Sequence, residues 1–249
     1  MKKNINELLK EVEVIKQVKI LYACETGSRA WGFPSPDSDY DIRFIYKHKP
    51  EWYLSLAARK DSIEKMQGDW DLSGWDLRKS LLLLKKSNAP LIERFQSPIV
   101  YFADNSFKKE FSKLITEYYS PIAAFYHHFS LAKKFLADVE QQEQIKLKSF
   151  FYLVRSLLSC NWIINNDSVL PMNIHALMIY TDTKRQQFLN DLIELKSEKN
   201  EDYLHKIKSE TKKWILQLFN TLENNKDKLR INNNNMNSLN DFFIKNIYE

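Results

Sequence analysis

The feature that most constrains this chain is a strand pattern that carries two aspartates. Between residues 39 and 46 polar and apolar side chains alternate, as Asp39-Tyr40-Asp41-Ile42-Arg43-Phe44-Ile45-Tyr46. Successive side chains of an extended chain point to opposite faces, so Asp39 and Asp41 share one face while the aromatic and aliphatic residues enter a core. Two carboxylates held so close repel each other unless a cation lies between them, and Mg²⁺ prefers oxygen ligands of this kind. The pattern predicts a strand that presents a divalent-metal site.

A Gly-Ser step lies just upstream and supplies a complementary element. Residues 18–23 form an apolar run rich in β-branched and aromatic residues, which indicates a strand, and Gly27-Ser28 follows it at the turn into a short helix. Glycine lets a backbone approach a ligand closely, and amides at the start of a helix or in a nest attract phosphate oxygens. A phosphate-binding turn and a metal-binding acid pair, separated by one short loop, indicate metal-assisted phosphoryl or nucleotidyl transfer.

These residues resemble a known motif. Gly27-Ser28, a ten-residue gap and Asp39-Tyr40-Asp41-Ile42 resemble the defining motif of the DNA polymerase beta nucleotidyltransferase superfamily. The longer stretches at residues 26–32, 38–44 and 74–79 read TGSRAWG, SDYDIRF and GWDLRK, and they are similar to bacterial and phage nucleotidyltransferases grouped as an RNA-repair-pathway family. The resemblance extends more loosely to about the two-thirds point of the chain and fades in the Asn-rich tail.

The resemblance implies a third carboxylate from a neighbouring strand. Residues 61–67 are expected to form one strand and residues 68–73 to continue it or form another, in which Asp69 and Asp71 share one face. Asp71 is the residue that we expect to act as the third ligand, and Asp69 is the alternative. Asp76 is better explained by the first turn of the following helix, where a negative charge favours the helix dipole.

The resemblance implies roles for the individual site residues. Asp39, Asp41 and Asp71 are the expected catalytic residues and the ligands of two Mg²⁺ ions (or Mn²⁺). The residues expected to hold the substrate phosphates are Gly27 and Ser28, with Arg29 or Arg43 assisting. Ser28 can also cap the short helix, which is a role that serine commonly fills and which is compatible with phosphate binding.

A helix in the second half offers further substrate-binding candidates. In the helix expected over residues 144–165, Lys148, Tyr152 and Arg155 follow one another at i, i+4 and i+7. On composition alone this row is a solvated helix face. The suspected family has a comparable Lys-…-Tyr-x-x-Arg helix, and the resemblance implies that the row holds a triphosphate or an acceptor backbone.

The periodicity changes along the chain and predicts two domains. The fold class expected is α/β (α+β), with a polymerase-beta-like nucleotidyltransferase domain over residues 1–103 that contains a small mixed sheet and flanking helices. Beyond residue 102 the pattern is helical and predicts no further strand, so residues 104–249 are expected to form an all-helical substrate-binding domain. Its helices are expected at 106–118, 121–141, 144–165, 184–195, 201–222 and 239–247, with an Asn-rich loop around 231–236.

Composition excludes several classes of protein. Among 249 residues there are only two cysteines, far apart and without a C-x-x-C pair, so we expect neither a disulfide framework nor a zinc knuckle. No run approaches the ~18 apolar residues that a membrane span needs, and the first residues do not resemble a signal peptide, so a cytoplasmic protein without membrane partners is expected. The net charge of +5 is compatible with an RNA partner but does not require one.

Two hypotheses about function follow. The first is an enzyme that moves a nucleoside monophosphate from a nucleoside triphosphate to a hydroxyl and releases pyrophosphate, with an RNA end, a small molecule or a protein side chain as the acceptor. The second is a catalytically silent nucleotidyltransferase-like binding module, such as a partner in a toxin–antitoxin pair. All three acidic positions are filled, which favours the enzyme. The sequence leaves open the preferred base, the acceptor and the oligomeric state.

Overall fold

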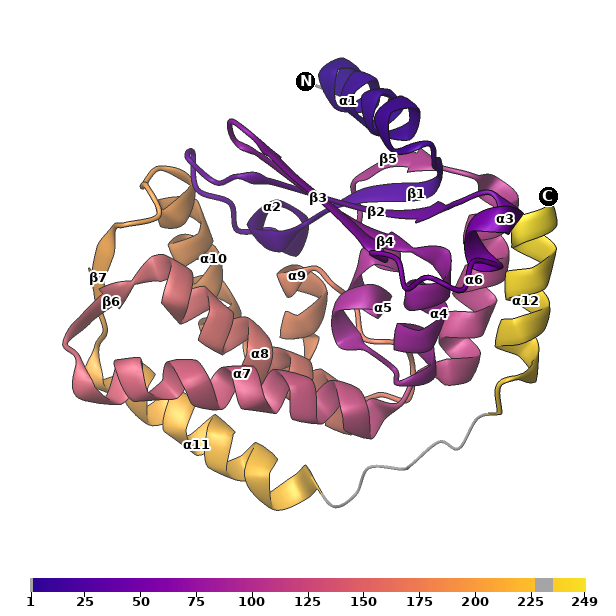
Figure 1. Ribbon diagram of the computed structural model, residues 1–249. Coiled ribbons are helices and arrows are strands. Elements are labelled where there is room, and N and C mark those ends of the chain that lie inside the picture. The colour runs from indigo at the N-terminus through magenta and orange to yellow at the C-terminus, as the bar shows by residue number, and fades with distance from the viewer. Residues whose placement is uncertain (1, 227–234) are drawn as a thin grey trace. The chain divides into compact units, whose positions relative to one another are not determined.

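The computed structural model describes residues 2–226 and 235–249 (Figure 1). Their contacts divide them into two units. The first, called here the sheet unit, contains described residues up to Gly27, then Asp39–Tyr119 and the C-terminal segment from residue 235. The second, called here the helical unit, contains Ser28–Ser38 and residues 120–226.

The sheet unit is built on a five-stranded mixed sheet, as the sequence predicts. The strand order is β3-β4-β2-β1-β5, in which β2 and β4 run parallel and the other neighbouring strands are antiparallel. Two-residue periodicity with buried aromatic and β-branched residues explains why these segments are extended. The strands are β1 (Lys19–Thr26), β2 (Tyr40–Lys47), β3 (Ser62–Gln67), β4 (Trp70–Asp76) and β5 (Val100–Ala103).

Helices cover both faces of this sheet. Helix α1 (Lys2–Lys16) lies on one side, where Leu8 and Val12 join a buried cluster with Phe44 of β2 (Figure 1). On the other side Phe95 stacks on Tyr22 of β1, with ring centroids 4.6 Å apart. The further helices of the sheet unit are α3 (Pro50–Tyr53), α4 (Leu77–Lys85), α5 (Ala89–Phe95), α6 (Asn105–Tyr118) and α12 (Asn237–Tyr248).

The helical unit has an aromatic core that includes part of the motif loop. Helix α2 (Gly27–Trp31) starts directly after β1. Phe33, just beyond this helix, is fully buried and stacks on Phe151, with ring centroids 4.9 Å apart. Burial of such a ring contributes about 2 kcal/mol, which ties the loop to the helices. The other elements of this unit are α7 (Pro121–Gln141), β6 (Gln144–Lys146), α8 (Leu147–Asn165), α9 (Ile174–Leu177), η1 (Met178–Tyr180), α10 (Thr183–Ser197), β7 (Leu204–Lys206) and α11 (Ser209–Asn225).

The structure differs from the expected domain organisation and from the expected helix limits. Helices α6 and α12 belong to the sheet unit, and residues 28–38 belong to the helical unit. The two units are therefore not separated by one boundary between residues 103 and 104. The expectation of no strand beyond residue 102 is wrong, because β6 pairs with β7 in an antiparallel ribbon. Those strands shorten the helices expected at 144–165 and 201–222, which begin at Leu147 and Ser209. Most of the expected Asn-rich loop at 231–236 lies outside the described residues.

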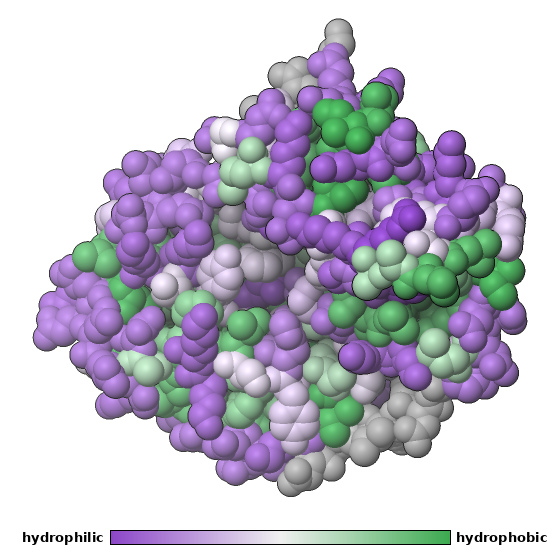
Figure 2. All heavy atoms as spheres, in the orientation of Figure 1, coloured by the Kyte–Doolittle hydropathy of each residue, from purple (hydrophilic) through white to green (hydrophobic). Residues whose placement is uncertain are grey.

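The face of the molecule drawn in Figure 2 is largely polar. In the view of Figure 2 hydrophilic residues predominate, and apolar residues gather in separate patches. Within residues 2–226 and 235–249, none of the helices has the length and apolar character needed to cross a membrane.

Candidate active site

Two of the predicted carboxylates face each other across neighbouring strands. The parallel register of β2 and β4 places Asp41 directly opposite Asp71. Both side chains are half-buried, with 30% and 35% of the side-chain surface exposed. Asp69 instead lies exposed in the turn between β3 and β4, where its carbonyl accepts a hydrogen bond from Tyr40 N at 2.8 Å. Of the two candidates for the third carboxylate, Asp71 is therefore the one that the register pairs with Asp41.

A guanidinium group bridges this acid pair. Arg43 Nη2 lies 2.7 Å from Asp41 Oδ1 and 2.8 Å from Asp71 Oδ2. Arg43 Nη1 donates to the carbonyl oxygens of Asp71 at 2.8 Å and Ile42 at 3.3 Å. Charge-assisted hydrogen bonds of this kind are the strong ones, so Arg43 holds both carboxylates in a defined geometry.

The donor set is suited to a hard divalent cation. One carboxylate oxygen of each aspartate is directed at the same nitrogen, and carboxylates are ligands that Mg²⁺ prefers. Asp39 lies exposed just before β2, two residues from Asp41. The described residues contain no cluster of three or more His, Cys, Asp or Glu side chains arranged to hold a metal ion. The present geometry therefore brings together two of the three expected ligands.

Gly27 lies against the acid pair. Its φ is +64°, and a methyl group placed on its Cα would lie only 2.0 Å from Asp41 Oδ2. The neighbouring Thr26 donates from Oγ1 to the carbonyl oxygen of Asp41 at 3.3 Å. A close backbone approach at Gly27 is what the sequence predicts, and here the group approached is the Asp41 carboxylate.

Sequence reasoning missed Glu25, a buried carboxylate behind the site. Glu25 is fully buried on β1, and its Oε1 accepts a hydrogen bond from the backbone amide of Asp41 at 2.7 Å. Its other oxygen accepts from the Tyr101 hydroxyl. The only sequence signal is a charged residue inside an otherwise apolar strand, two positions before Gly27. Glu25 fixes the backbone from which Asp41 projects.

A buried arginine, Arg94, was also missed. It is 3% exposed, its guanidinium carbon lies 3.4 Å from the centre of the Trp75 ring, and it donates to the carbonyl oxygen of Phe44 at 3.1 Å. Burial lowers the pKa of Arg94 to about 9, so the side chain is still cationic at neutral pH. Burial also raises the pKa of the nearby Cys24 to about 12, which leaves its thiol protonated and unsuited to nucleophilic catalysis.

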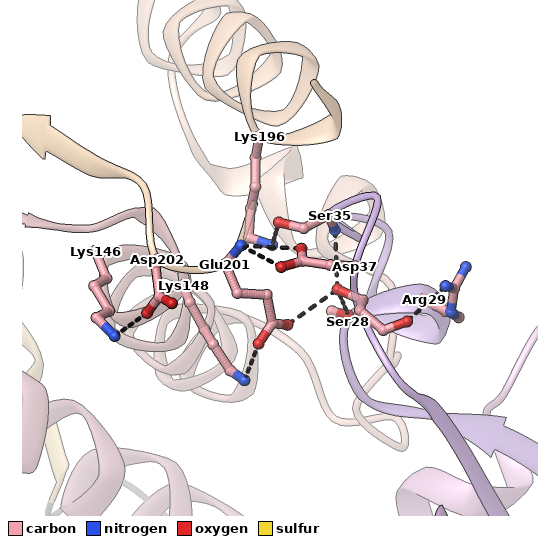
Figure 3. A network of polar contacts seen from close by, with 10 residues as sticks. Ser28, Arg29, Ser35, Asp37, Lys146, Lys148, Lys196, Glu201 and Asp202 are labelled. Carbon is pink, nitrogen blue, oxygen red and sulfur yellow. Dashed lines mark hydrogen bonds and ion pairs between the residues drawn. The ribbon is translucent and has the colours of Figure 1, made fainter. Parts of the chain in front are cut away.

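The hydroxyl part of the motif belongs to the helical unit (Figure 3). Ser28 donates from Oγ to Ser38 Oγ at 3.1 Å, and Ser38 Oγ donates to Glu201 Oε1 at 3.0 Å. Arg29 Nη2 donates to the carbonyl oxygen of Ser38 at 2.6 Å. The serine predicted to bind phosphate is therefore linked to the residue that directly precedes Asp39 in the chain.

A carboxylate from a distant segment joins this network (Figure 3). Lys148 at the start of α8 donates to Glu201 Oε2 at 2.5 Å, and the Glu201 amide donates to Asp37 at 3.0 Å. The buried Lys196 donates to Ser35 Oγ at 2.8 Å. Glu201 thus engages two of the groups that could bind an anion, the Lys148 ammonium and the Ser38 hydroxyl.

The other two members of the predicted α8 row surround an indole. Tyr152 contacts Trp31 edge-on, with ring centroids 5.2 Å apart. The Arg155 guanidinium carbon lies 4.5 Å from the centre of the Trp31 ring. Arg155 is buried and donates from Nε and Nη2 to the carbonyl oxygen of Met172, at 3.2 and 3.1 Å. A solvated helix face, the reading from composition alone, is therefore wrong for Arg155.

With this geometry described, the chain can be compared with known proteins. A family model described as the RNA repair pathway DNA polymerase beta family (RlaP) matches residues 1–245. The chain belongs to this family. The family assignment agrees with the resemblance found in the motifs at residues 26–32, 38–44 and 74–79 and with the nucleotidyltransferase-like fold class.

A bacterial relative is similar over most of the chain. The protein from Bacillus subtilis (strain 168) named "Uncharacterized protein YcgL" is 46% identical over 179 residues, which cover 72% of this chain and 69% of that protein. A crystal structure of a nucleotidyltransferase-like protein from Exiguobacterium sibiricum 255-15 aligns over 92% of this chain and 75% of the other, with 9% identity and a TM-score of 0.33. A similarity at that level carries no argument about the site.

Proposed function

We propose that this member of the family transfers a nucleoside monophosphate from a nucleoside triphosphate to a hydroxyl group and releases pyrophosphate. The observation that carries the proposal is the facing pair of Asp41 and Asp71 next to the close backbone turn at Gly27. The family membership supports a nucleotidyltransferase, and the filled acidic positions support an active one.

The acid residues are assigned to cation binding. Asp41 and Asp71, with Asp39 beside them in the chain, would hold Mg²⁺ or Mn²⁺. When bound, the ion supplies Lewis-acid polarisation of the phosphates and lowers the pKa of an attacking hydroxyl. Glu25 positions Asp41 through its backbone amide, which keeps the carboxylate directed at the site.

Hydrogen-bond donors near the motif are assigned to the triphosphate. Ser28 directly follows Gly27 in the chain, and Arg29, Lys148 and Arg43 supply positive charge. Arginine binds phosphate in a planar, two-pronged geometry, whereas lysine acts as a point charge. Tyr152 and Arg155 pack around Trp31, so we assign them to shaping this part of the chain in addition to the substrate contact that the resemblance implies.

The transfer requires no covalent enzyme intermediate. The acceptor oxygen forms a bond to the α-phosphorus, and the bond from that phosphorus to the α–β bridging oxygen breaks. Pyrophosphate leaves with the bonding electrons, and the proton of the acceptor hydroxyl passes to a carboxylate of the acid pair. Positioning and charge stabilisation account for the rate in this type of reaction.

An RNA end is the acceptor that we propose. Its support is the description of the family and the net charge of +5, which favours a polyanionic partner. A small molecule or a protein side chain remains the alternative acceptor, and a silent binding module remains the alternative function.

The test is incubation with Mg²⁺ and each labelled nucleoside triphosphate, with separate RNA, protein and small-molecule fractions as acceptors. We expect pyrophosphate release and label in the RNA fraction. Asp41→Asn and Asp71→Asn should each lower the rate by about 100-fold or more, because removing a ligand costs at least as much as removing its supporting residue. Asp61→Asn, at an exposed residue paired with Lys79, is the matched control and should keep the rate.

Label in the protein or small-molecule fraction would replace the RNA acceptor with that class. Equal label transfer by wild type and both acid variants would exclude the proposed catalytic site. No pyrophosphate release with any triphosphate and acceptor would favour the silent module.

A further inference from the structure

We propose that Arg43 is a tethered cation that competes with divalent ions for Asp41 and Asp71. In the metal-free protein its guanidinium compensates part of the charge of the acid pair, and a metal ion binds only when Arg43 Nη2 leaves. This inference rests on the metal site of the proposed function, and it concerns binding and not turnover.

The geometry places the arginine nitrogen where a bridging cation would lie. One atom, Nη2, contacts a carboxylate oxygen of each aspartate, at 2.7 and 2.8 Å. An NH₂ group of a guanidinium has two hydrogens, and here each one is used by a different carboxylate. An ion bound by these two oxygens needs the same space, so Arg43 and the ion exclude each other.

Arg43 is held in this position by the backbone as well. Its Nη1 donates to two carbonyl oxygens, those of Asp71 and Ile42. Only 18% of its side chain is exposed, so little water competes for these hydrogen bonds. The contact is therefore a built part of the sheet rather than a loose surface ion pair of the kind that contributes 0 to ~1 kcal/mol.

The charges around Arg43 favour its position on the acids. The buried guanidinium of Arg94, whose contacts include the Trp75 ring and the Phe44 carbonyl, repels the cation of Arg43. Repulsion from this interior charge opposes a guanidinium at this position, whereas attraction by the two carboxylates of Asp41 and Asp71 favours it. Like charges at short range repel each other, and the Arg43 guanidinium between Asp41 and Asp71 reduces that repulsion.

Competition has a quantitative consequence. If Arg43 occupies the acids in nine of ten metal-free molecules, the apparent affinity for the ion falls about tenfold, because only the remaining fraction can bind. Once displaced, the guanidinium is available to an anion, which is consistent with the phosphate-binding role expected for Arg43. The arginine would then connect ion binding with triphosphate binding.

The experiment measures Mn²⁺ binding to the full chain without nucleotide, by electron paramagnetic resonance of free Mn²⁺. Arg43→Met keeps most of the aliphatic stem and removes the charge, and we expect its Kd for Mn²⁺ to be about tenfold lower than that of wild type. Lys65→Met is the matched control, because Lys65 on β3 pairs with Glu11 of α1 and not with the acid pair, and its Kd should equal that of wild type.

A second measurement covers the case in which Arg43→Met folds poorly. Arg43→Lys keeps a cation on a side chain that lacks the planar fork, and its Kd should fall between those of Arg43→Met and wild type. The melting temperature should rise more on adding Mn²⁺ for either variant than for wild type.

Equal or weaker Mn²⁺ binding by folded Arg43 variants would overturn the competition. Tighter binding by these variants, together with no pyrophosphate release by wild type, would retain the competition and exclude the proposed transfer reaction. The two hypotheses therefore fail on different measurements.

Discussion

At the residue scale, the carboxylates of this protein differ in how their charge is compensated. Asp41 and Asp71 share the guanidinium of Arg43, whereas Asp76 is fully buried and accepts hydrogen bonds from the Tyr53 hydroxyl at 2.7 Å and the Arg78 amide at 2.8 Å. Burial raises the pKa of Asp76, although both hydrogen bonds act in the opposite direction. The expected role of Asp76 at the start of a helix is confirmed, since it is the N-cap of α4.

The raised pKa of Asp76 predicts a pH dependence of stability. The folded state binds the proton more tightly than the unfolded state, so this residue stabilises the fold at low pH and loses that contribution as pH rises above the usual aspartate pKa of about 4. The free energy of unfolding of wild type minus that of Asp76→Asn should therefore fall between pH 4 and pH 7, measured by urea unfolding.

Asp76→Ala separates charge from hydrogen bonding. It removes both acceptors, and its free energy of unfolding should lie about 1–3 kcal/mol below that of Asp76→Asn at each pH. A wild-type-minus-Asn difference that stays constant or rises with pH would contradict the raised pKa.

Gly27 gives a second prediction at this scale. Gly27→Ala imposes a side chain at positive φ and forces the Asp41 carboxylate to move, since the new methyl would lie 2.0 Å from Oδ2. We expect a loss of about 2–4 kcal/mol in unfolding free energy, from strain at φ > 0 plus overpacking, and weaker Mn²⁺ binding.

Gly68→Ala is the matched control for Gly27→Ala. Its φ is +58°, but a methyl group there has no atom within 4 Å. It should show only the backbone strain, about 1–2 kcal/mol, and unchanged Mn²⁺ binding. Equal effects of the two substitutions on both measurements would mean that Gly27 acts through its backbone conformation alone.

At the element scale, the parallel pairing of β2 and β4 and the loop of residues 28–38 position the predicted site residues. The pairing sets Asp41 against Asp71, and it is tight enough that a methyl group on Gly74 would lie 2.1 Å from the Phe44 ring. Phe33 holds the loop in the aromatic core of the helical unit. Glu201 also holds it, by accepting a hydrogen bond from the Ser38 hydroxyl.

The Glu201 contacts predict how this loop is ordered. Glu201→Ala removes the acceptor of the hydrogen bond that the Ser38 hydroxyl donates. Ser38 Oγ itself accepts a hydrogen bond from the Ser35 amide at 3.0 Å. Hydrogen bonds to a charged group are worth about 1.5–3 kcal/mol, so exchange of the Ser35 and Ser38 amides should accelerate about tenfold or more, measured by hydrogen–deuterium exchange.

Glu198→Ala, at an exposed residue three positions earlier, is the control and should leave the exchange of both amides unchanged. Equal exchange in the two variants would show that Phe33 alone orders the loop.

At the scale of the whole molecule, the chain passes between its two units inside the motif itself. Gly27 and Asp39 belong to the sheet unit, whereas Ser28 and Ser38 belong to the helical unit. The acid residues and the hydroxyl residues of one sequence motif are thus supported by different cores. Contacts between distant segments assign each residue to its core, which explains why a single boundary drawn from periodicity at residue 103 differs from this division.

Local patterns by themselves determined much of this protein. Two-residue alternation predicts the strand that carries Asp41, and glycine before serine marks the turn at residue 27, because strand and turn geometry depend on neighbouring residues alone. The motifs at residues 26–32, 38–44 and 74–79 also indicated the family. The helix limits at Pro121 and Gln141 follow from proline and helical spacing and agree with α7.

Only the tertiary structure decided which groups meet. Strand register rests on backbone hydrogen bonds that have no residue code. The resemblance favoured Asp71 over Asp69, but only the fold shows that Asp71 lies directly opposite Asp41. The bridging Arg43, the buried Glu25 and the contact of Glu201 with Ser38, 163 positions away, likewise depend on how separate elements pack. Sequence periodicity specifies the face of a side chain, whereas its partner is specified by packing between distant segments.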